Sequence, residues 1–334
     1  MVHVNYNQHI LQQARLDRTD LQIIRLLARD SRTPYRSIAS AIGITPSAAK
    51  ERINKMFSNG VIESFIVLIN PVIFGYEKLC FLILRNIDKT IKEQDIFKKV
   101  TLLGNIMGIS KHLEGAAIFA LYVRDMTEEK IGILTELLKP ATLETVFASL
   151  RPVGMKIQSS DLEIMKRLLS DPRMAVEDIA NETSLSSKTV GRRLEKMREN
   201  HILQFTISTN PSSMRLTGYI EFVVLIEVKI SSHAGIFKRI YHELEEYLLH
   251  IPNGYQREVI FAVFFCANIS TVNLILRRLE SYDGVNKVES LIVTSLTIYQ
   301  DWLKGEIDKR ITNQKHFSLS SSDAVATTTR DFII

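Results

Sequence analysis

The amino-acid sequence predicts an α+β protein in which a pair of small domains, one of three helices and one of mixed strands and helices, occurs twice. One observation is a repeat, because Asp20-Leu21 and Ile38-Ala39 recur about 141 residues later as Asp161-Leu162 and Ile179-Ala180. Another is that each copy opens with three amphipathic segments of helical period and continues with alternating strand and helix patterns. This period is too long for a solenoid, so it indicates a tandem duplication of a whole domain pair.

Composition limits the class of protein. The chain has 334 residues, 46% of them hydrophobic and 24% charged, which is ordinary for a soluble globular protein of two or more domains. Cys80 and Cys266 lie in apolar runs, which favours buried strand residues over a redox or metal role. We find no metal-ligand spacing, signal peptide or membrane-spanning run, so we expect a cytoplasmic protein without metal or cofactor and without a membrane partner.

The net charge of +5 is concentrated in one region. Residues 15–62 hold nine Lys or Arg and four Asp or Glu, whereas residues 159–203 hold eight of each and residues 76–150 hold ten of each. A local surplus of cations favours a polyanionic partner, although a solvated basic face would show the same charge.

The first copy begins with a head of three helices. Asp17 is the expected N-cap of a helix to about Ala28, and Pro34 fits the first turn of a second helix to about Ile42. Gly43 permits a tight left-handed turn, and Thr45 followed by Pro46 starts a third helix to about Ser58. The second head repeats the pattern, with expected helices at 160–170, 175–183 and 187–200. A strand follows each head, at 61–70 and 201–209, and Asn-Pro ends it.

The rest of each copy has a βαββαβ order, which places both helices on one face of a sheet and leaves the other face bare. We expect strands at 78–85, 104–110, 115–123 and 142–149, then at 218–230, 254–258, 259–267 and 285–298. We expect helices at 90–100, 127–138, 235–249, 270–282 and 299–311. The expected domains are the heads 15–71 and 158–211, the ferredoxin-like domains 76–151 and 216–311, the second with an extra C-terminal helix, and a disordered tail 312–334.

Three helices followed at once by a strand are typical of a winged helix-turn-helix, whose third helix enters the major groove of double-stranded DNA. Lys and Arg on the outer face would hold phosphates, and short polar side chains would reach base edges. The candidate DNA-binding residues of the first head are Arg32, Tyr35, Arg36, Thr45, Ser47, Lys50, Glu51, Asn54 and Lys55. Those of the second head are Ser186, Lys188, Thr189, Arg192, Arg193 and Lys196. We expect the first head to bind more strongly, since Glu177, Asp178 and Glu182 line the second helix of the other.

The first copy resembles the Lrp/AsnC family of transcriptional regulators. The resemblance rests on Leu16-Asp17-Arg18-Thr19-Asp20, Ile38-Ala39, Ile44-Thr45-Pro46-Ser47, Arg52-Ile53 and Gly60-Val61-Ile62, and on Asn70-Pro71 before Gly75. It covers nearly all of copy one and, more weakly, copy two. It implies operator-specific DNA binding by a head joined to a βαββαβ ligand-sensing domain, which usually dimerises by packing sheet on sheet.

The chain departs from that family in two respects. It carries two heads, so its bare sheet faces would pack on each other as an intrachain pseudo-dimer, and a further homodimer is left open. The acidic residue of the family's effector loop is missing, since the region reads Glu114-Gly115-Ala116-Ala117 in copy one and Gln256-Arg257-Glu258-Val259 in copy two. A small-molecule effector therefore stays unassigned.

Two other functions remain open. A siroheme-decarboxylase-like tetrapyrrole enzyme would use His112 and Tyr122 of copy one and His250 and Tyr255 of copy two, although the expected His-Asn-Tyr-type run is missing. A protein-interaction adaptor with degenerate heads would fit the balanced charge of the second head. The regulator without catalysis is the function that the sequence favours.

Overall fold

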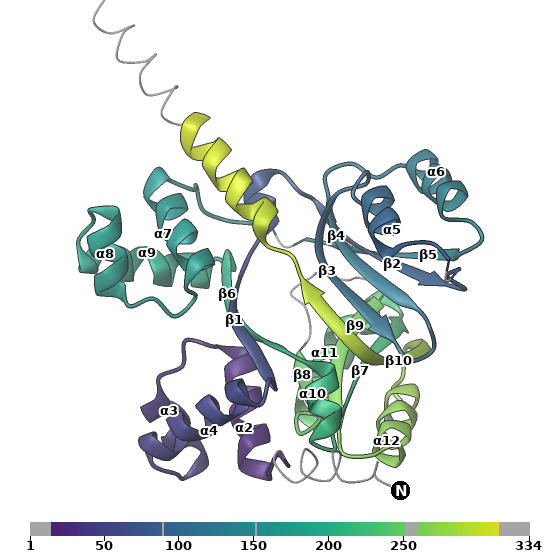
Figure 1. Ribbon diagram of the computed structural model, residues 1–334, viewed down its shortest axis with the longest axis horizontal. Coiled ribbons are helices and arrows are strands. Elements are labelled where there is room, and N and C mark those ends of the chain that lie inside the picture. The colour runs from purple at the N-terminus through teal and green to yellow at the C-terminus, as the bar shows by residue number, and fades with distance from the viewer. Residues whose placement is uncertain (1–14, 89, 151, 251–258, 314–334) are drawn as a thin grey trace, which may run out of the picture. The chain divides into compact units, whose positions relative to one another are not determined.

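The computed structural model describes residues 15–88, 90–150, 152–250 and 259–313 (Figure 1). The described chain divides into two compact units, one of residues up to Pro152 with Gln204–Tyr299, the other of Val153–Leu203 with residues from Gln300 on. None of the described helices is both long and apolar enough to cross a bilayer. The strand expected at 254–258 and residues 314–334 of the expected tail lie outside the described residues.

The first unit opens with the expected head. Its helices are α2 (Arg18–Arg29), α3 (Tyr35–Ile42) and α4 (Pro46–Ser58), followed by strand β1 (Ile62–Ile69). Asp17 caps α2 in a capping box with Asp20, and Gly43 ends α3 in the left-handed conformation with φ 75°. Pro34 is the N-cap of α3 and not a residue of its first turn, a shift of one position that keeps its missing N–H outside the helix.

The expected βαββαβ order is present in both copies, but in copy two the helix expected at 235–249 ends at Glu243 and the third element is a strand at Leu248–His250, while the strand expected at 254–258 lies outside the described residues. Copy one has β2 (Lys78–Arg85), α5 (Glu93–Val100), β3 (Asn105–His112), β4 (Ala117–Val123), α6 (Glu128–Leu138) and β5 (Thr142–Ser149). Copy two has β7 (Ile220–Val228), α11 (His233–Glu243), β8 (Leu248–His250), β9 (Val259–Cys266), α12 (Ile269–Glu280) and β10 (Val285–Ile298). A short helix precedes the first strand of each copy, η1 (Pro71–Phe74) before β2 and α10 (Pro211–Leu216) before β7, and Asn70 and Asn210 are their N-caps. A third short helix, η2 (Ile230–Ser232), precedes α11.

All eight of these strands form one antiparallel sheet in the order β5-β2-β4-β3-β10-β7-β9-β8. β10 joins the two copies, because its first half pairs with β7 and its second half, from Val293 to Ile298, pairs with β3. The bare faces pack on each other as well, since the ring of Phe81 on β2 stacks on that of Phe261 on β9 with centroids 4.5 Å apart. The sequence indicated the packing of the two faces but not the pairing of β3 with β10.

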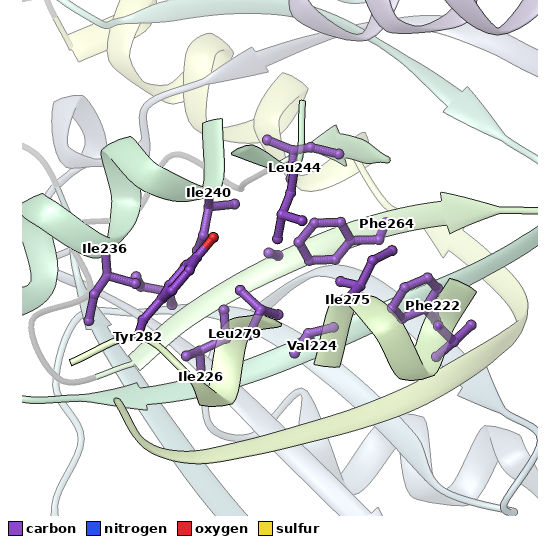
Figure 2. Packing of buried hydrophobic residues seen from close by; sticks show 14 of the residues in the cluster. Phe222, Val224, Ile226, Ile236, Ile240, Leu244, Phe264, Ile275, Leu279 and Tyr282 are labelled. Atoms are coloured by element: carbon purple, nitrogen blue, oxygen red, sulfur yellow. The ribbon is translucent and has the colours of Figure 1, made fainter. Parts of the chain in front are cut away.

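The helix-covered faces hold the cores of the two βαββαβ domains. In copy two, alternate residues of β7 face α11 and α12, and Figure 2 shows Phe222, Val224 and Ile226 packed with side chains of both helices. In copy one, Cys80, Leu82 and Leu84 take the same place beneath α5 and α6. Both cysteines are therefore buried and unpaired, as their apolar neighbours indicated.

Strand β6 (Leu203–Thr209) follows the second head in sequence but pairs with β1 of the first head. Its Thr206 hydroxyl donates to the carbonyl of Ala28 at 2.8 Å, and its Phe205 carbonyl accepts from the N–H of Ser31. Ile207 of β6, Met214 of α10 and Phe265 of β9 belong to the same buried cluster as the helices of the first head. Copy two thus completes the core of the first head.

The second unit contains the second head, with α7 (Ser159–Ser170), α8 (Val176–Thr183) and α9 (Ser187–Glu199). It also contains a helix at residues 301–313, which the sequence analysis placed in the second βαββαβ domain. Leu303, Ile307 and Ile311 form a buried stripe along this helix, and Asp308 pairs with Lys166 of α7 at 2.7 Å. The apolar stripe and the ion pair explain why the helix belongs with the head.

Candidate nucleic-acid interface

The third helix of each head has one buried face and one exposed face. Ala49, Ile53 and Met56 bury one face of α4, and Val190, Leu194 and Met197 do the same for α9. The hydroxyls of Thr45 and Ser186 accept hydrogen bonds from the backbone N–H of the third residue of each helix, Ala48 and Thr189, and so fix where the helix starts. The opposite face of each helix is directed away from the core of its head.

Most of the expected DNA-contacting side chains are exposed, on the outer faces of α4 and α9, at their N-caps or on α3. Among them, the exposed ones are Arg36, Thr45, Ser47, Lys50, Glu51, Asn54, Lys55, Ser186, Lys188, Arg192 and Lys196, and Thr189 is half-buried. Within the part of the chain that the structure describes, none of Lys50, Lys55, Lys188, Arg192 and Lys196 forms an ion pair. These cations stay available to an anionic ligand such as a phosphate backbone.

Arginines at the border of the two faces are directed inward. The guanidinium of Arg52 lies 2.7 Å from a carboxylate oxygen of Asp17 and 2.8 Å from one of Asp20, and hydrogen bonds to these carboxylates raise the pKa of Arg52. Arg193 in the second head lies 3.4 Å from Asp161, whose side chain is fully buried. Arg193 was grouped with the DNA-contacting side chains, but the structure directs it toward α7 of its own head.

The residues around the second helix of the first head are divided between surface and support. Arg36 is exposed, while Tyr35 is half-buried against the core of the head. The guanidinium of Arg32 lies over the ring of Phe205, 5.3 Å from its centroid. The sequence could not reveal Phe205 as a supporting residue, because it lies in β6 of copy two, about 170 residues from Arg32.

The residues expected for a tetrapyrrole enzyme are buried in copy one. His112 is only 4% exposed, its Nε2 lies 3.0 Å from the Ser110 hydroxyl, and burial lowers its pKa to about 4. The Tyr122 hydroxyl donates to Met107 Sδ, and burial raises the pKa of Tyr122. The side chain of His250 and all of Tyr255 lie outside the described residues. No three His, Cys, Asp or Glu side chains of the described chain gather as metal ligands.

Comparison with known proteins gives the same two heads. The model of an AsnC-type helix-turn-helix domain matches residues 16–56 and again residues 159–198. An uncharacterized HTH-type transcriptional regulator of Pyrococcus horikoshii is 30% identical over 128 residues, which are 37% of this chain and 78% of that protein. Another, of Pyrococcus abyssi, is 30% identical over 143 residues, which are 42% of this chain and 85% of that protein.

Among solved structures, that of the siroheme decarboxylase NirDL covers 90% of this chain and 100% of its own, with 12% identity and a TM-score of 0.46. At this sequence identity and TM-score the similarity does not indicate a shared function.

Proposed function

Because the chain belongs to the Lrp/AsnC family of DNA-binding transcription regulators, we propose that α4 and α9 are two recognition helices that one chain presents to paired operator half-sites. The observation that carries this proposal is the set of exposed cations without ion pairs on the outer faces of both helices. Those cations would hold phosphates, while Ser47, Asn54 and Thr189 reach base edges. Arg36 would meet the backbone, and Arg52 and Arg193 would brace the heads.

The second part of the proposal is that the two βαββαβ domains act as a pseudo-dimer within one chain. The pairing of β3 with β10 and the stacking of Phe81 on Phe261 support it, because together they hold the two domains edge to edge and face to face. This arrangement would do within one chain what two chains do in a sheet-packed dimer. We leave the effector unassigned and propose a cytoplasmic location, where two buried free thiols would stay reduced.

The third part is that the first head contributes most of the affinity. Its surplus of basic over acidic residues equals that of the whole chain, and the second head is balanced. In the second head the acidic Glu182 of α8 pairs with Arg167 of α7 at 3.2 Å, whereas Glu177 and Asp178 stay exposed beside it. Carboxylates near a phosphate backbone oppose binding, so the second head would add specificity more than affinity.

The experiment measures duplex binding by fluorescence anisotropy, with duplexes selected from a random pool. Replacing Lys50→Ala and Lys55→Ala together should weaken binding to every duplex and reduce the slope of log affinity against log salt by about 2, roughly 0.9 for each lost phosphate contact. Ser47→Ala and Asn54→Ala should instead change which duplexes are selected. Selected sites should contain paired half-sites about one helical turn apart or a multiple of it.

The matched control replaces Lys92→Ala and Lys98→Ala, two exposed lysines at α5 and outside both heads. This control removes the same charge and should leave binding within about twofold, apart from weak long-range electrostatics. An unchanged affinity after the replacement of Lys50 and Lys55, or an equal loss in the control, would contradict the assignment of α4.

We also propose that the chain has no catalytic role. His112 and Tyr122 are buried, and their side chains contact Ser110 and Met107. An absorbance titration with an iron tetrapyrrole tests this part separately. Saturable binding at micromolar concentration that is lost in His112→Ala would favour the enzyme instead.

A further inference from the structure

The third helices of the two heads can be compared position by position. α4 and α9 are both 13 residues long, and their buried side chains fall at the same places along each helix. The corresponding buried residues are Ala49 and Val190, Ile53 and Leu194, and Met56 and Met197. Every pair is separated by the same stretch of sequence, so each outer position of α4 has one defined counterpart on α9.

The positions that hold each helix in place have the same chemistry in both heads. These positions are occupied by the N-caps Thr45 and Ser186, the inward-directed arginines Arg52 and Arg193, and the exposed lysines Lys55 and Lys196. The two heads therefore share the start of the helix, its brace against the first helix and one cation for a phosphate.

Three positions of the outer face differ instead. Ser47, Glu51 and Asn54 of α4 correspond to Lys188, Arg192 and Glu195 of α9. In each set the successive residues are four and then three positions apart, so the three side chains share one face of their helix. All six side chains are exposed, and none forms an ion pair within the described part of the chain. The differences thus lie on the surface that faces a ligand and not in the packing.

The two sets of side chains suit different bases. Arg and Lys donate to the O6 and N7 acceptors of guanine, Asn pairs with the N6 and N7 groups of adenine, and Glu accepts from the N4 amino group of cytosine. Lys188 and Arg192 therefore select guanine, and Asn54 selects adenine. At the position of Arg192 the first head has Glu51, whose carboxylate is repelled by the acceptors of guanine, so one head rejects the base that the other selects.

We propose that the DNA partner of this chain is a duplex with two unlike half-sites, one with adenine read by Asn54 and the other with guanine read by Lys188 and Arg192. This inference rests on the proposed function, since it requires α4 and α9 to enter major grooves. It places Lys188 and Arg192 on base edges and leaves Lys55 and Lys196 for phosphates. A palindromic operator mirrors two identical heads. Two unlike heads on one chain remove that symmetry, so the operator has a direction.

The first measurement identifies the half-sites, by selection of duplexes from a random pool with the full chain. The wild type should select two half-sites of different sequence. Arg192→Ala should relax the choice of a G·C pair in one of them, and Asn54→Ala the choice of an A·T pair in the other. Selection of two alike half-sites, or of a single one, would overturn this inference while the chain still binds DNA.

The second measurement exchanges the base-reading residues. Lys188→Ser, Arg192→Glu and Glu195→Asn together give α9 the outer face of α4. Fluorescence anisotropy compares the duplex of unlike half-sites with one in which the half-site of the first head occurs twice. The wild type should prefer the unlike pair by at least about tenfold, and the triple variant should prefer the repeated half-site. The ratio of the two affinities within each variant cancels a uniform loss caused by the altered charge.

The matched control is Lys196→Glu, which makes the same change of net charge on the same helix at a position that is alike in both heads. It should weaken binding to both duplexes and keep the preference of the wild type. Circular dichroism melts check that the variants stay folded. A folded triple variant that keeps the wild-type preference would overturn this inference alone. A wild type that binds no duplex would overturn the proposed function with it.

Discussion

The two heads have the same helices and differ in what completes their cores. The first head shares its buried cluster with Ile207, Met214 and Phe265, all from copy two. The second head shares its compact unit with the helix at 301–313, whose Asp308 pairs with Lys166. In both cases a segment distant in sequence supplies the missing packing. The difference teaches that a head of this chain is not a free-standing domain, even though a repeat in the sequence marks it as one.

The largest expected effect concerns the strand that completes the first head. Phe205 of β6 is 2% exposed and supports Arg32, so Phe205→Ala should lower the free energy of unfolding by about 4 kcal/mol through a cavity and lost contacts. Hydrogen exchange should rise in α2 and α3. Leu216→Ala, at a 56% exposed position, is the control and should change stability by less than about 1 kcal/mol. Faster exchange in the second head alone would show that β6 does not support the first.

The buried carboxyl of Glu221 gives a second test of how the first head depends on copy two, because it lies where that head joins the sheet. Burial raises the pKa of Glu221 to about 7, and the Thr209 hydroxyl donates to it at 3.0 Å. The folded state keeps the proton that the unfolded state loses, so this contribution to stability is present at low pH and is lost as pH rises from about 4.5 to about 7. Glu221→Gln should therefore be more stable than the wild type at pH 8, by up to about 3 kcal/mol.

At pH values below the ordinary carboxyl range, Glu221→Gln and the wild type should have equal stability, because both side chains are neutral there. Glu63, which also raises the pKa of Glu221, is exposed and gives the control Glu63→Gln, with a smaller effect expected at pH 8. A wild type whose stability rises between pH 5 and pH 8 relative to Glu221→Gln would show that the carboxyl is ionised in the fold.

The helix at 301–313 allows the matching test for the second head. Ile307 is fully buried, so Ile307→Ala should cost about 3 kcal/mol. Hydrogen exchange should rise in α7, while α2 should keep its rate. If α2 and α7 changed together, the two heads would form one cooperative unit and the comparison would fail. An exposed residue of the same helix, Lys309, gives the control Lys309→Ala.

The smallest expected effect is the difference in stability loss between replacing Arg193 in the second head and replacing Arg52 in the first. Arg193→Ala leaves the fully buried Asp161 carboxylate without its cation and should cost about 2 kcal/mol. Arg52→Ala should cost about 1 kcal/mol, because Asp17 is about half exposed to water and the more buried Asp20 keeps its hydrogen bond from the backbone N–H of Asp17. Thermal unfolding measures both. Equal losses would mean that removing the cation costs no more at the buried Asp161 than at the exposed Asp17.

The heads could be predicted from the sequence because their signals are local. Asp17, Gly43 and Thr45 act on backbone groups within a few residues, and the helix ends follow from them. The partners of β6 and β10 could not be predicted, since a strand pattern gives the alternation of faces and not the neighbour. The helix near 301–313 was expected, but its stripe of Leu303, Ile307 and Ile311 does not say which surface it covers.

The candidate DNA-binding site also contains some residues whose position the local sequence predicts and others whose position depends on distant segments. Helical period alone puts Lys50 and Lys55 on an outer face, and both are exposed in the structure. The inward direction of Arg193 depends on Asp161, a residue of another helix, and the packing of Arg32 depends on Phe205 of another copy. Contacts between distant segments therefore limit how finely the sequence alone defines the DNA-binding surface.

The long stretch of sequence between β3 and its partner β10 has a consequence for folding during synthesis. This strand begins at Val285, about 170 residues after the end of β3 at His112, and it is the neighbour that β3 lacks until then. A ribosome must add those residues before the edge of copy one is covered. A nascent chain that stopped before Val285 would expose β3, and we expect such fragments to aggregate or to need a chaperone.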